Sequence, residues 1–362
     1  FPRMCAYNDV EGWQNKQFLG RGEFALVFGD YDVRLTVPSD HLVASTGELI
    51  NADDVLSKDQ LKRLKQAEKE SVQPVIIASK EEADVRMTGK ATDTKTWHFK
   101  AANVRDFGWA SSRRFIWDAM GVPLSGKTVM AASMYVKEGD CLWSQYSTKA
   151  VAHTLKWYSH YTFDYPYPIA WSIDGSMGME YPMICFNYGR CEDDNTYSKR
   201  TKYGHIGVII HEVGHNWFPM IVNSDERQWT WMDEGLNSYV QYLAEQQWER
   251  NYPFRRGPAR NITNYMGGDK DKIVPIMSNS EAIPQFGNNA YGKPATALNI
   301  LRETVMGREL FDHAFREYSN RWRFKNPKPA DLFRTIEDAS GTDLDWFWRG
   351  WFYTTDHVDQ EL

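Results

Sequence analysis

The chain has 362 residues and a net charge of −6, and it contains no long basic run. This charge balance argues against a general nucleic-acid-binding protein. No stretch approaches the roughly 18 consecutive apolar residues that indicate a transmembrane helix, so we expect no membrane-spanning segment. The length exceeds what one hydrophobic core usually supports, and we therefore expect two domains.

The first part of the chain, residues 1–112, has the pattern of a β-sheet domain. Apolar and polar side chains alternate along residues 31–37, which predicts one buried and one wet face. A highly charged run at residues 57–70 predicts a short surface helix. The expected strands are, in order, residues 23–29, 31–37, 75–77 and 96–99. The segment after residue 104 should close the domain near residue 112.

The second domain is expected to begin with a strand at residues 128–136, followed by a helix over residues 142–161. Two further strands, at residues 171–173 and 184–186, should flank a segment that contains Gly178, Met179 and Glu180. We expect that segment to form a sheet edge. Gly178 would allow close backbone approach there, so an extended peptide could add itself as a strand.

A metal-binding pattern follows at His211, Glu212 and His215. Residues four apart on a helix project from one face, so the two imidazoles should lie together. With a carboxylate from elsewhere they would make the three-ligand site of a catalytic zinc, whose fourth position is left to water. Glu212 could take the proton from that water. The alternative is a surface helix with two ordinary histidines, which the apolar surroundings disfavour.

Two elements around the motif support this interpretation. The apolar residues on both sides of the histidines predict one buried helix that ends near Pro219. Glu234 opens a second helical pattern, and two antiparallel helices would bring it opposite the histidine pair. Beyond it, residues 251–290 are expected to form long loops, and the strongly aromatic residues 345–352 should pack on the catalytic lobe. The later helices are expected at residues 294–305, 311–322 and 329–339.

The motifs resemble those of the M1 family of zinc aminopeptidases, which are gluzincins and include the leukotriene A4 hydrolases. The similarity rests on three signatures: Gly-Met-Glu at 178–180, His-Glu-x-x-His followed after eighteen intervening residues by Glu234, and Tyr-x-Lys at 291–293. Three flanking residues depart from the family pattern, namely Met177, Tyr181 and Pro294. The similarity runs over most of residues 1–355.

The resemblance implies an α+β fold. Residues 1–112 would be the C-terminal part of an N-terminal β-sheet domain, present only in part. Residues 113–355 would form a thermolysin-like, mainly helical zinc-peptidase catalytic domain. Residues 356–362 would begin a missing C-terminal region, so we expect the chain to be a fragment or a processed form.

The resemblance also implies the site and its reaction. One zinc ion would be held by His211, His215 and Glu234, with Glu212 as general base and Tyr291 stabilising the oxyanion. Glu180, together with Gly178 and Met179, would bind the substrate and anchor its free α-amine. The chain would then remove the N-terminal residue from peptides that have a free N-terminus. Because Tyr181 replaces the usual Asn, the pocket for the first side chain cannot be read.

Other functions stay open at this point. The chain could be a non-catalytic binding module of the same fold, an epoxide hydrolase, or an endopeptidase if Glu180 points away from the cleft. The intact set of His211, Glu212, His215, Glu234 and Tyr291 favours an enzyme over a binding module.

The cysteines carry little information about the site or the compartment. They are Cys5, Cys141, Cys185 and Cys191, their spacing is irregular, and no C-x-x-C motif indicates a cysteine zinc site. Cys185 and Cys191 could bridge around a short turn or remain free buried thiols. The compartment is undetermined, and a periplasmic or secreted location is preferred to a cytoplasmic one.

Overall fold

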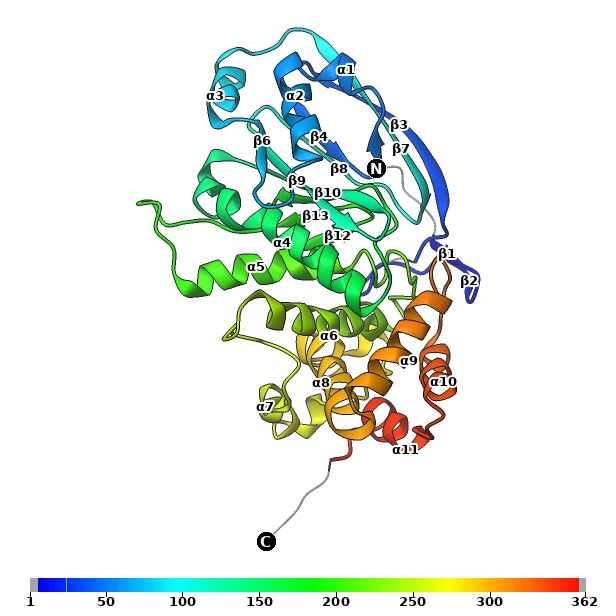
Figure 1. Cartoon of the computed structure of the whole chain (residues 1–362). Coiled ribbons are helices and arrows are strands. Elements are labelled where there is room, and N and C mark those ends of the chain that lie inside the picture. The colour runs from blue at the N-terminus through cyan, green and yellow to red at the C-terminus, as the bar shows by residue number, and fades with distance from the viewer. Residues whose placement is uncertain (1–5, 24, 358–362) are drawn as a thin grey trace. The chain divides into compact units, whose positions relative to one another are not determined.

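The computed structural model describes residues 6–23 and 25–357 (Figure 1). Contacts between residues divide the chain into two compact units. The sheet unit comprises residues 28–160 and 164–216, and the helical unit comprises the described part of residues 1–27, 161–163 and 217–362. The predicted boundary near residue 112 is not one of the positions at which these units divide.

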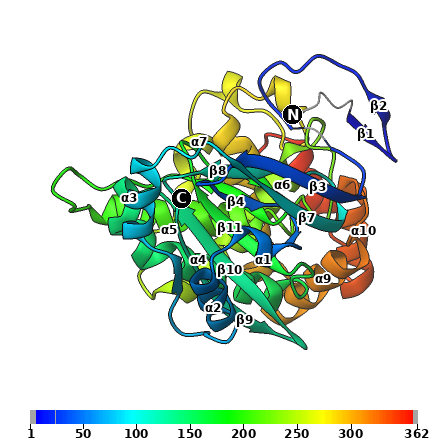
Figure 2. The ribbon, with the colours of Figure 1, turned by 90° about the horizontal axis from the view of Figure 1, so that it is seen from above.

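The sheet unit is built on a six-stranded mixed sheet of order β12-β13-β11-β10-β9-β6. β10 is parallel to β11 and β11 to β13, whereas the other neighbours are antiparallel. Figure 2 shows β9, β10 and β11 of this sheet side by side. β6 pairs with β9, so this sheet joins segments from both sides of residue 112. The six strands are β6 (Val75–Ala78), β9 (Ile116–Leu124), β10 (Lys127–Tyr135), β11 (Ile169–Asp174), β12 (Met179–Tyr181) and β13 (Ile184–Asn187).

Two smaller sheets complete the strands of this unit, one of order β3-β7-β5 and one formed by β4 and β8. Along β3 the apolar side chains are the covered ones: Val37 is buried, and Asp32 and Arg34 are exposed. The predicted alternation over residues 31–37 is therefore confirmed. The strands are β3 (Gly29–Pro38), β4 (Leu42–Ser45), β5 (Glu48–Leu49), β7 (Thr94–Val104) and β8 (Trp109–Ser112).

Helices pack on the large sheet. The hydroxyl of Ser147 on α4 lies 2.8 Å from that of Ser133 on β10 and donates to that of Ser172 on β11 over 3.0 Å. α5 contacts β11, β12 and β13, which places the helix with the histidine motif beside the sheet edge. The helices of this unit are α1 (Ala52–Val55), α2 (Lys58–Ala67), α3 (Lys80–Thr88), α4 (Asp140–Tyr161) and α5 (Lys199–Gly214).

The helical unit has an aromatic interior. One aromatic cluster joins Tyr239 on α6 edge-to-face to Phe311 and Phe315 on α9, with centroid distances of 5.7 Å. A second places Trp231 against Phe352, 4.7 Å apart, so residues 345–352 pack into this unit as expected. Its main elements are β1 (Ala6–Asn8), β2 (Gly12–Gln14), α6 (Thr230–Trp248), α7 (Thr263–Met266), α8 (Lys293–Ile300), α9 (Arg308–Arg321), α10 (Pro329–Ser340) and α11 (Asp345–Trp348). Most strands lie in the sheet unit and the helical unit is mainly helical, so the architecture is α+β, as predicted.

Two predicted elements differ from the structure. Of the strand expected at 23–29, the described residues 25–28 are not in a strand, and β3 begins only at Gly29. The side chain of Asn223 donates to the carbonyl of Leu26 over 2.8 Å, so that carbonyl bonds to a side chain instead of a neighbouring strand.

The histidine helix ends earlier than predicted. α5 stops at Gly214, because the backbone and side-chain nitrogens of Asn216 both donate to the carbonyl of Val213. Its side-chain oxygen accepts from the backbone of Met183 on the sheet side over 2.8 Å. Trp217 and Phe218 therefore follow the helix in a turn.

The suggested bridge between Cys185 and Cys191 is wrong. Cys191 is bonded to Cys141, which joins the first turn of α4 to the loop before α5. Cys185 is a free, buried thiol. It lies on β13 and donates to the carbonyl of Trp171 over 3.2 Å, so its place in the core leaves it out of reach of the loop. Cys5 lies outside the described residues, as do Phe1, Pro2, Arg3 and most of residues 356–362.

Within residues 6–23 and 25–357 we find no helix whose length and hydropathy would let it cross a bilayer.

Candidate active site

The histidine motif lies on the last turn of α5 and just beyond it. The side chain of Ser198 caps the start of this helix by accepting from the backbone of Thr201 over 3.0 Å. His211 and Glu212 are in the final helical turn, and His215 is the residue that caps the helix. All three side chains are buried. The sequence places these polar groups in the apolar second half of α5, where burial without a partner costs roughly 2–7 kcal/mol by transfer estimates.

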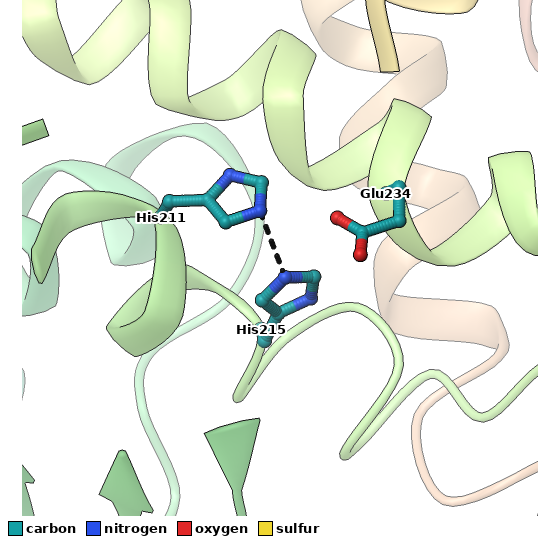
Figure 3. Close-up of side chains that lie close together, drawn as sticks. All are labelled: His211, His215 and Glu234. Atoms are coloured by element: carbon teal, nitrogen blue, oxygen red, sulfur yellow. Dashed lines mark hydrogen bonds between the residues drawn. The ribbon is translucent and has the colours of Figure 1, made fainter. Parts of the chain in front are cut away.

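The two imidazoles lie at right angles, with centroids 4.6 Å apart and planes crossing at 87°. Their Nε2 atoms are 3.1 Å apart (Figure 3). At this separation either one ring donates to the other, or both nitrogen lone pairs face a common ion. Neutral imidazole nitrogens are preferred zinc ligands. The pair therefore fits a zinc ion, as the four-residue spacing predicted.

Glu212 occupies a space that Gly178 leaves open. A methyl group at Gly178 would stand 2.9 Å from Cδ of Glu212 and 3.1 Å from Cγ2 of Val208, both inside van der Waals contact. Because Gly178 has no side chain, the carboxylate of Glu212 can lie next to the start of β12. Sequence reasoning assigned Gly178 to close backbone approach, and the structure shows that the group approaching it includes the side chain of Glu212.

Met179 and Glu180 lie on β12, which is the edge strand of the large sheet. β12 pairs only with β13 in that sheet, with Glu180 opposite Cys185. Glu180 is 4% exposed, so it is a buried strand residue and not a surface glutamate on a loop. The expected sheet edge is confirmed at Met179 and Glu180, and Gly178 lies just before this strand. Burial of Cys185 behind it raises the pKa of that thiol, which excludes a reactive thiolate at this position.

The other two predicted site residues, Glu234 and Tyr291, belong to the helical unit. Glu234 is buried in the first turns of α6. Tyr291 is half-buried in a π-helical segment, Gly287–Gly292, that leads into α8. Its hydroxyl donates to Oε1 of Glu234 over 2.5 Å. Burial, and then the charge of Glu234, raise the pKa of Tyr291, so the phenol is neutral and is a hydrogen-bond donor.

Gly235 allows the segment with Tyr291 to lie close enough to α6 for the hydrogen bond between Tyr291 and Glu234. A methyl group at Gly235 would stand 2.5 Å from Cγ of Pro294 and 3.0 Å from the carbonyl oxygen of Ala290. The segment that carries Tyr291 therefore lies against α6 only because residue 235 has no side chain. Pro294, one of the three residues that depart from the family pattern, forms this contact with its ring.

One neighbour of the pair was not found from the sequence. The guanidinium of Arg256 lies over the ring of Tyr291, 4.1 Å from its centroid. Arg256 belongs to no motif and stands in a segment rich in Pro, Gly and Asn that was predicted only as loop. No sequence pattern could have connected it to a tyrosine 35 positions later, since the contact depends on the path of the loop.

Residues 146–351 match the model of the peptidase family M1 domain. The alanine/arginine aminopeptidase of Saccharomyces cerevisiae is 23% identical over 225 residues, which cover 58% of this chain and 26% of that protein. The glutamyl aminopeptidase of Sus scrofa is 25% identical over 154 residues, which cover 41% of this chain and 16% of that protein. The chain thus spans about a quarter or less of the length of these curated relatives.

Solved structures share the fold. An M1 zinc metallopeptidase from Deinococcus radiodurans has a TM-score of 0.63 and 18% sequence identity, over 93% of this chain and 66% of that chain. A mutant M1 zinc metallopeptidase from the same organism, bound to a Tyr-Ser-Ala substrate, has a TM-score of 0.60 and 16% identity over the same share of both chains.

Proposed function

Because the chain belongs to peptidase family M1, we propose that it is a zinc-dependent aminopeptidase that removes the N-terminal residue from peptides. The observation that carries the proposal is the buried imidazole pair, whose Nε2 atoms face each other over 3.1 Å, with Glu212 beside it in the space left by Gly178. The names of the relatives above, which are aminopeptidases, support the same reaction.

In this proposal one zinc ion is held by His211, His215 and Glu234. Two imidazoles and a carboxylate are the donor set of a catalytic zinc, and all three side chains are buried. The hydrogen bond from Tyr291 to Glu234 supports the ligand role, because ligand carboxylates are usually oriented by such a bond. A bound zinc ion supplies a Lewis acid and lowers the pKa of its water towards about 7.

Glu212 moves the proton. Its carboxylate takes a proton from the attacking water and returns it to the nitrogen of the leaving peptide, so the side chain ends each turnover as it began. Such a base contributes roughly 10²–10⁴-fold to the rate.

Tyr291 is the proposed donor to the negative oxygen that develops on the scissile carbonyl. Its hydroxyl donates to Glu234 in the structure, and rotation about the C–O bond alone would redirect the same proton. The raised pKa keeps that proton on the phenol.

Glu180 is the proposed anchor for the substrate's free α-amine. A buried carboxylate on an edge strand can pair with an ammonium group while the peptide extends along Gly178 and Met179. This anchor would restrict cleavage to the first peptide bond. Residues 113–355, within which the family match lies, would form the catalytic domain.

We also propose a periplasmic or secreted location. The bond between Cys141 and Cys191 supports it, because structural disulfides persist mainly in oxidising compartments.

The test is the hydrolysis of aminoacyl arylamides by the zinc-loaded protein and by Glu212→Gln. We expect the variant to keep its zinc content and to lose at least about 10²-fold in kcat. A chelator should abolish turnover by the wild type, and N-acetylated arylamides should not be cleaved. As a matched control, Glu192→Gln changes an exposed glutamate in the same unit and should turn over like the wild type.

Undiminished turnover by Glu212→Gln would refute its role as base. Cleavage of N-acetylated and free-amine substrates at similar rates would instead indicate an endopeptidase. Absence of both metal and turnover in the wild type would indicate a binding module.

A further inference from the structure

Arg256 contacts the ring of Tyr291 and a side chain of α6. Its guanidinium carbon is 4.1 Å from the ring centroid, and its Nη1 donates to Oγ of Ser238 on α6 over 3.3 Å. Burial lowers the pKa of the guanidinium, and the charges of Glu234 and Glu245 oppose this shift because they favour the positive form. The guanidinium is therefore held in place by the Tyr291 ring and by the hydroxyl of Ser238.

The backbone around Arg256 is shaped to aim it at α6. Gly257 has φ +98°, in the left-handed region that favours glycine, and an added methyl would stand 2.6 Å from Cδ1 of Tyr242. Glu234, Ser238, Tyr242 and Glu245 recur at helical spacing on α6, so they share one face of that helix. The loop turns against this face and places the Arg256 side chain next to the carboxylate that Tyr291 contacts.

We propose that Arg256 is a positioning residue for Tyr291: its guanidinium holds the phenol ring so that the hydroxyl stays at the carboxylate of Glu234 and faces the reacting carbonyl. This inference rests on the proposed function, in which Tyr291 is the oxyanion donor. Tyr291 stands in a π-helical segment and its ring is only half-buried, so the stacked guanidinium supplies a contact on a ring face. A cation over a phenol ring also makes the hydroxyl a stronger donor, because it stabilises negative charge on the oxygen.

An arginine suits this place better than a lysine. The planar guanidinium stacks on an aromatic face while its edge donates hydrogen bonds, so one group can contact the ring and Ser238 together. The ammonium of a lysine is a point charge that would keep the attraction to the ring and lose the stacking.

The experiment is a double-mutant cycle on the zinc-loaded protein, with Arg256→Gln, Tyr291→Phe and the pair, measuring kcat and KM separately on an aminoacyl arylamide. We expect Arg256→Gln to lower kcat about tenfold with KM nearly unchanged, since cation–π contacts of this kind contribute about that much. It should lower kcat no further in the Tyr291→Phe background, because it acts through the hydroxyl. Arg255→Gln, which removes the exposed neighbouring arginine, is the matched control and should leave kcat unchanged.

A second measurement does not depend on turnover. In metal-free protein with ¹³C-labelled tyrosine, the ring resonance of Tyr291 can be assigned by its loss in Tyr291→Phe. We expect Arg256→Gln to shift and broaden this resonance and Arg255→Gln to leave it in place. If Arg256→Gln does not fold, Arg256→Lys takes its place, and it should keep more of kcat while still shifting the resonance.

Three outcomes separate the two proposals. Loss of kcat in Tyr291→Phe without loss in Arg256→Gln overturns the role of Arg256 and leaves the aminopeptidase proposal standing. Equal losses on removing Arg256 in both backgrounds overturn it as well, because the effect would not pass through Tyr291. Wild-type turnover by Tyr291→Phe overturns the oxyanion role, and an unmoved ring resonance in Arg256→Gln then overturns the positioning role too.

Discussion

Each unit of the molecule places a glycine against a part of the candidate site, but the two glycines face different kinds of neighbour. An added methyl at Gly178, in the sheet unit, would meet the carboxylate end of Glu212. An added methyl at Gly235, in the helical unit, would meet the ring of Pro294 and the backbone oxygen of Ala290. The end of a glutamate can swing away at little cost, whereas a proline ring and a backbone cannot. The same small change should therefore alter chemistry in one unit and stability in the other.

The largest effect is expected for Gly178→Ala. The methyl group should displace the Glu212 carboxylate from its place beside β12, and loss of a positioned base lowers kcat/KM by about 10²–10³-fold. The free energy of unfolding should change by less than about 1 kcal/mol, because the side chain that moves is flexible. Arylamide kinetics and urea unfolding of the same preparation measure the two quantities.

The control for this variant is Gly204→Ala. Gly204 lies on α5, which also carries Glu212, and no atom outside the local helix stands within 4 Å of an added methyl. It should keep wild-type kinetics and gain about 0.5–1 kcal/mol of stability, as alanine does in a helix. Wild-type kcat/KM in Gly178→Ala would show that Glu212 does not need the space beside Gly178.

Gly235→Ala should lower stability more than Gly178→Ala does. Overpacking against a ring and a carbonyl typically costs about 1–3 kcal/mol, so we expect the free energy of unfolding to fall by that amount and the urea midpoint to fall with it. Because Pro294 and Ala290 flank Tyr291, kcat should fall as well. Gly350→Ala in the same unit has no atom within 4 Å of the new methyl and should unfold like the wild type. A Gly235→Ala variant as stable as Gly350→Ala would contradict the close contact between α6 and the segment that carries Tyr291.

The comparison also explains what could be predicted from the sequence. The local spacing of residues predicted the proximity of the two histidines, the edge strand that follows Gly178, and α4. Each of these depends only on the pattern within one element. Local spacing failed where a distant partner decides the outcome. The early end of α5 depends on Asn216, which reaches Met183 on the sheet, and the partner of Cys191 is Cys141, 50 positions away. Arg256 is the strongest case, since its contact with Tyr291 joins a loop and a π-helical segment that no pattern links.

A smaller, pH-dependent effect should extend the contrast between the units, because each unit has, outside the candidate site, a buried carboxyl group whose pKa is raised. Burial raises the pKa of Asp118, in the sheet unit, to about 6, and that of Glu245, in the helical unit, to about 8. Unfolded carboxyls titrate near about 3.9 for Asp and about 4.3 for Glu. Between the unfolded and folded values the folded state binds the extra proton, so stability is highest below the unfolded pKa and falls as pH rises to the folded one.

Each carboxyl contributes a slope of at most about 1.4 kcal/mol per pH unit inside its own window. Burial raises the pKa of Asp118, and the hydroxyls of Tyr135 and Thr148 limit this rise because they donate hydrogen bonds to the charged carboxylate. Its window therefore ends near pH 6. Glu245 accepts from the amide of Gln241 over 2.9 Å, and its window reaches about pH 8. Glu245→Gln should therefore remove a fall in the free energy of unfolding between about pH 4 and 8, and Asp118→Asn one between about pH 4 and 6. Urea titrations across pH 4–8 measure both, and identical pH profiles for the two variants above pH 6 would show that the two windows do not end at different pH values.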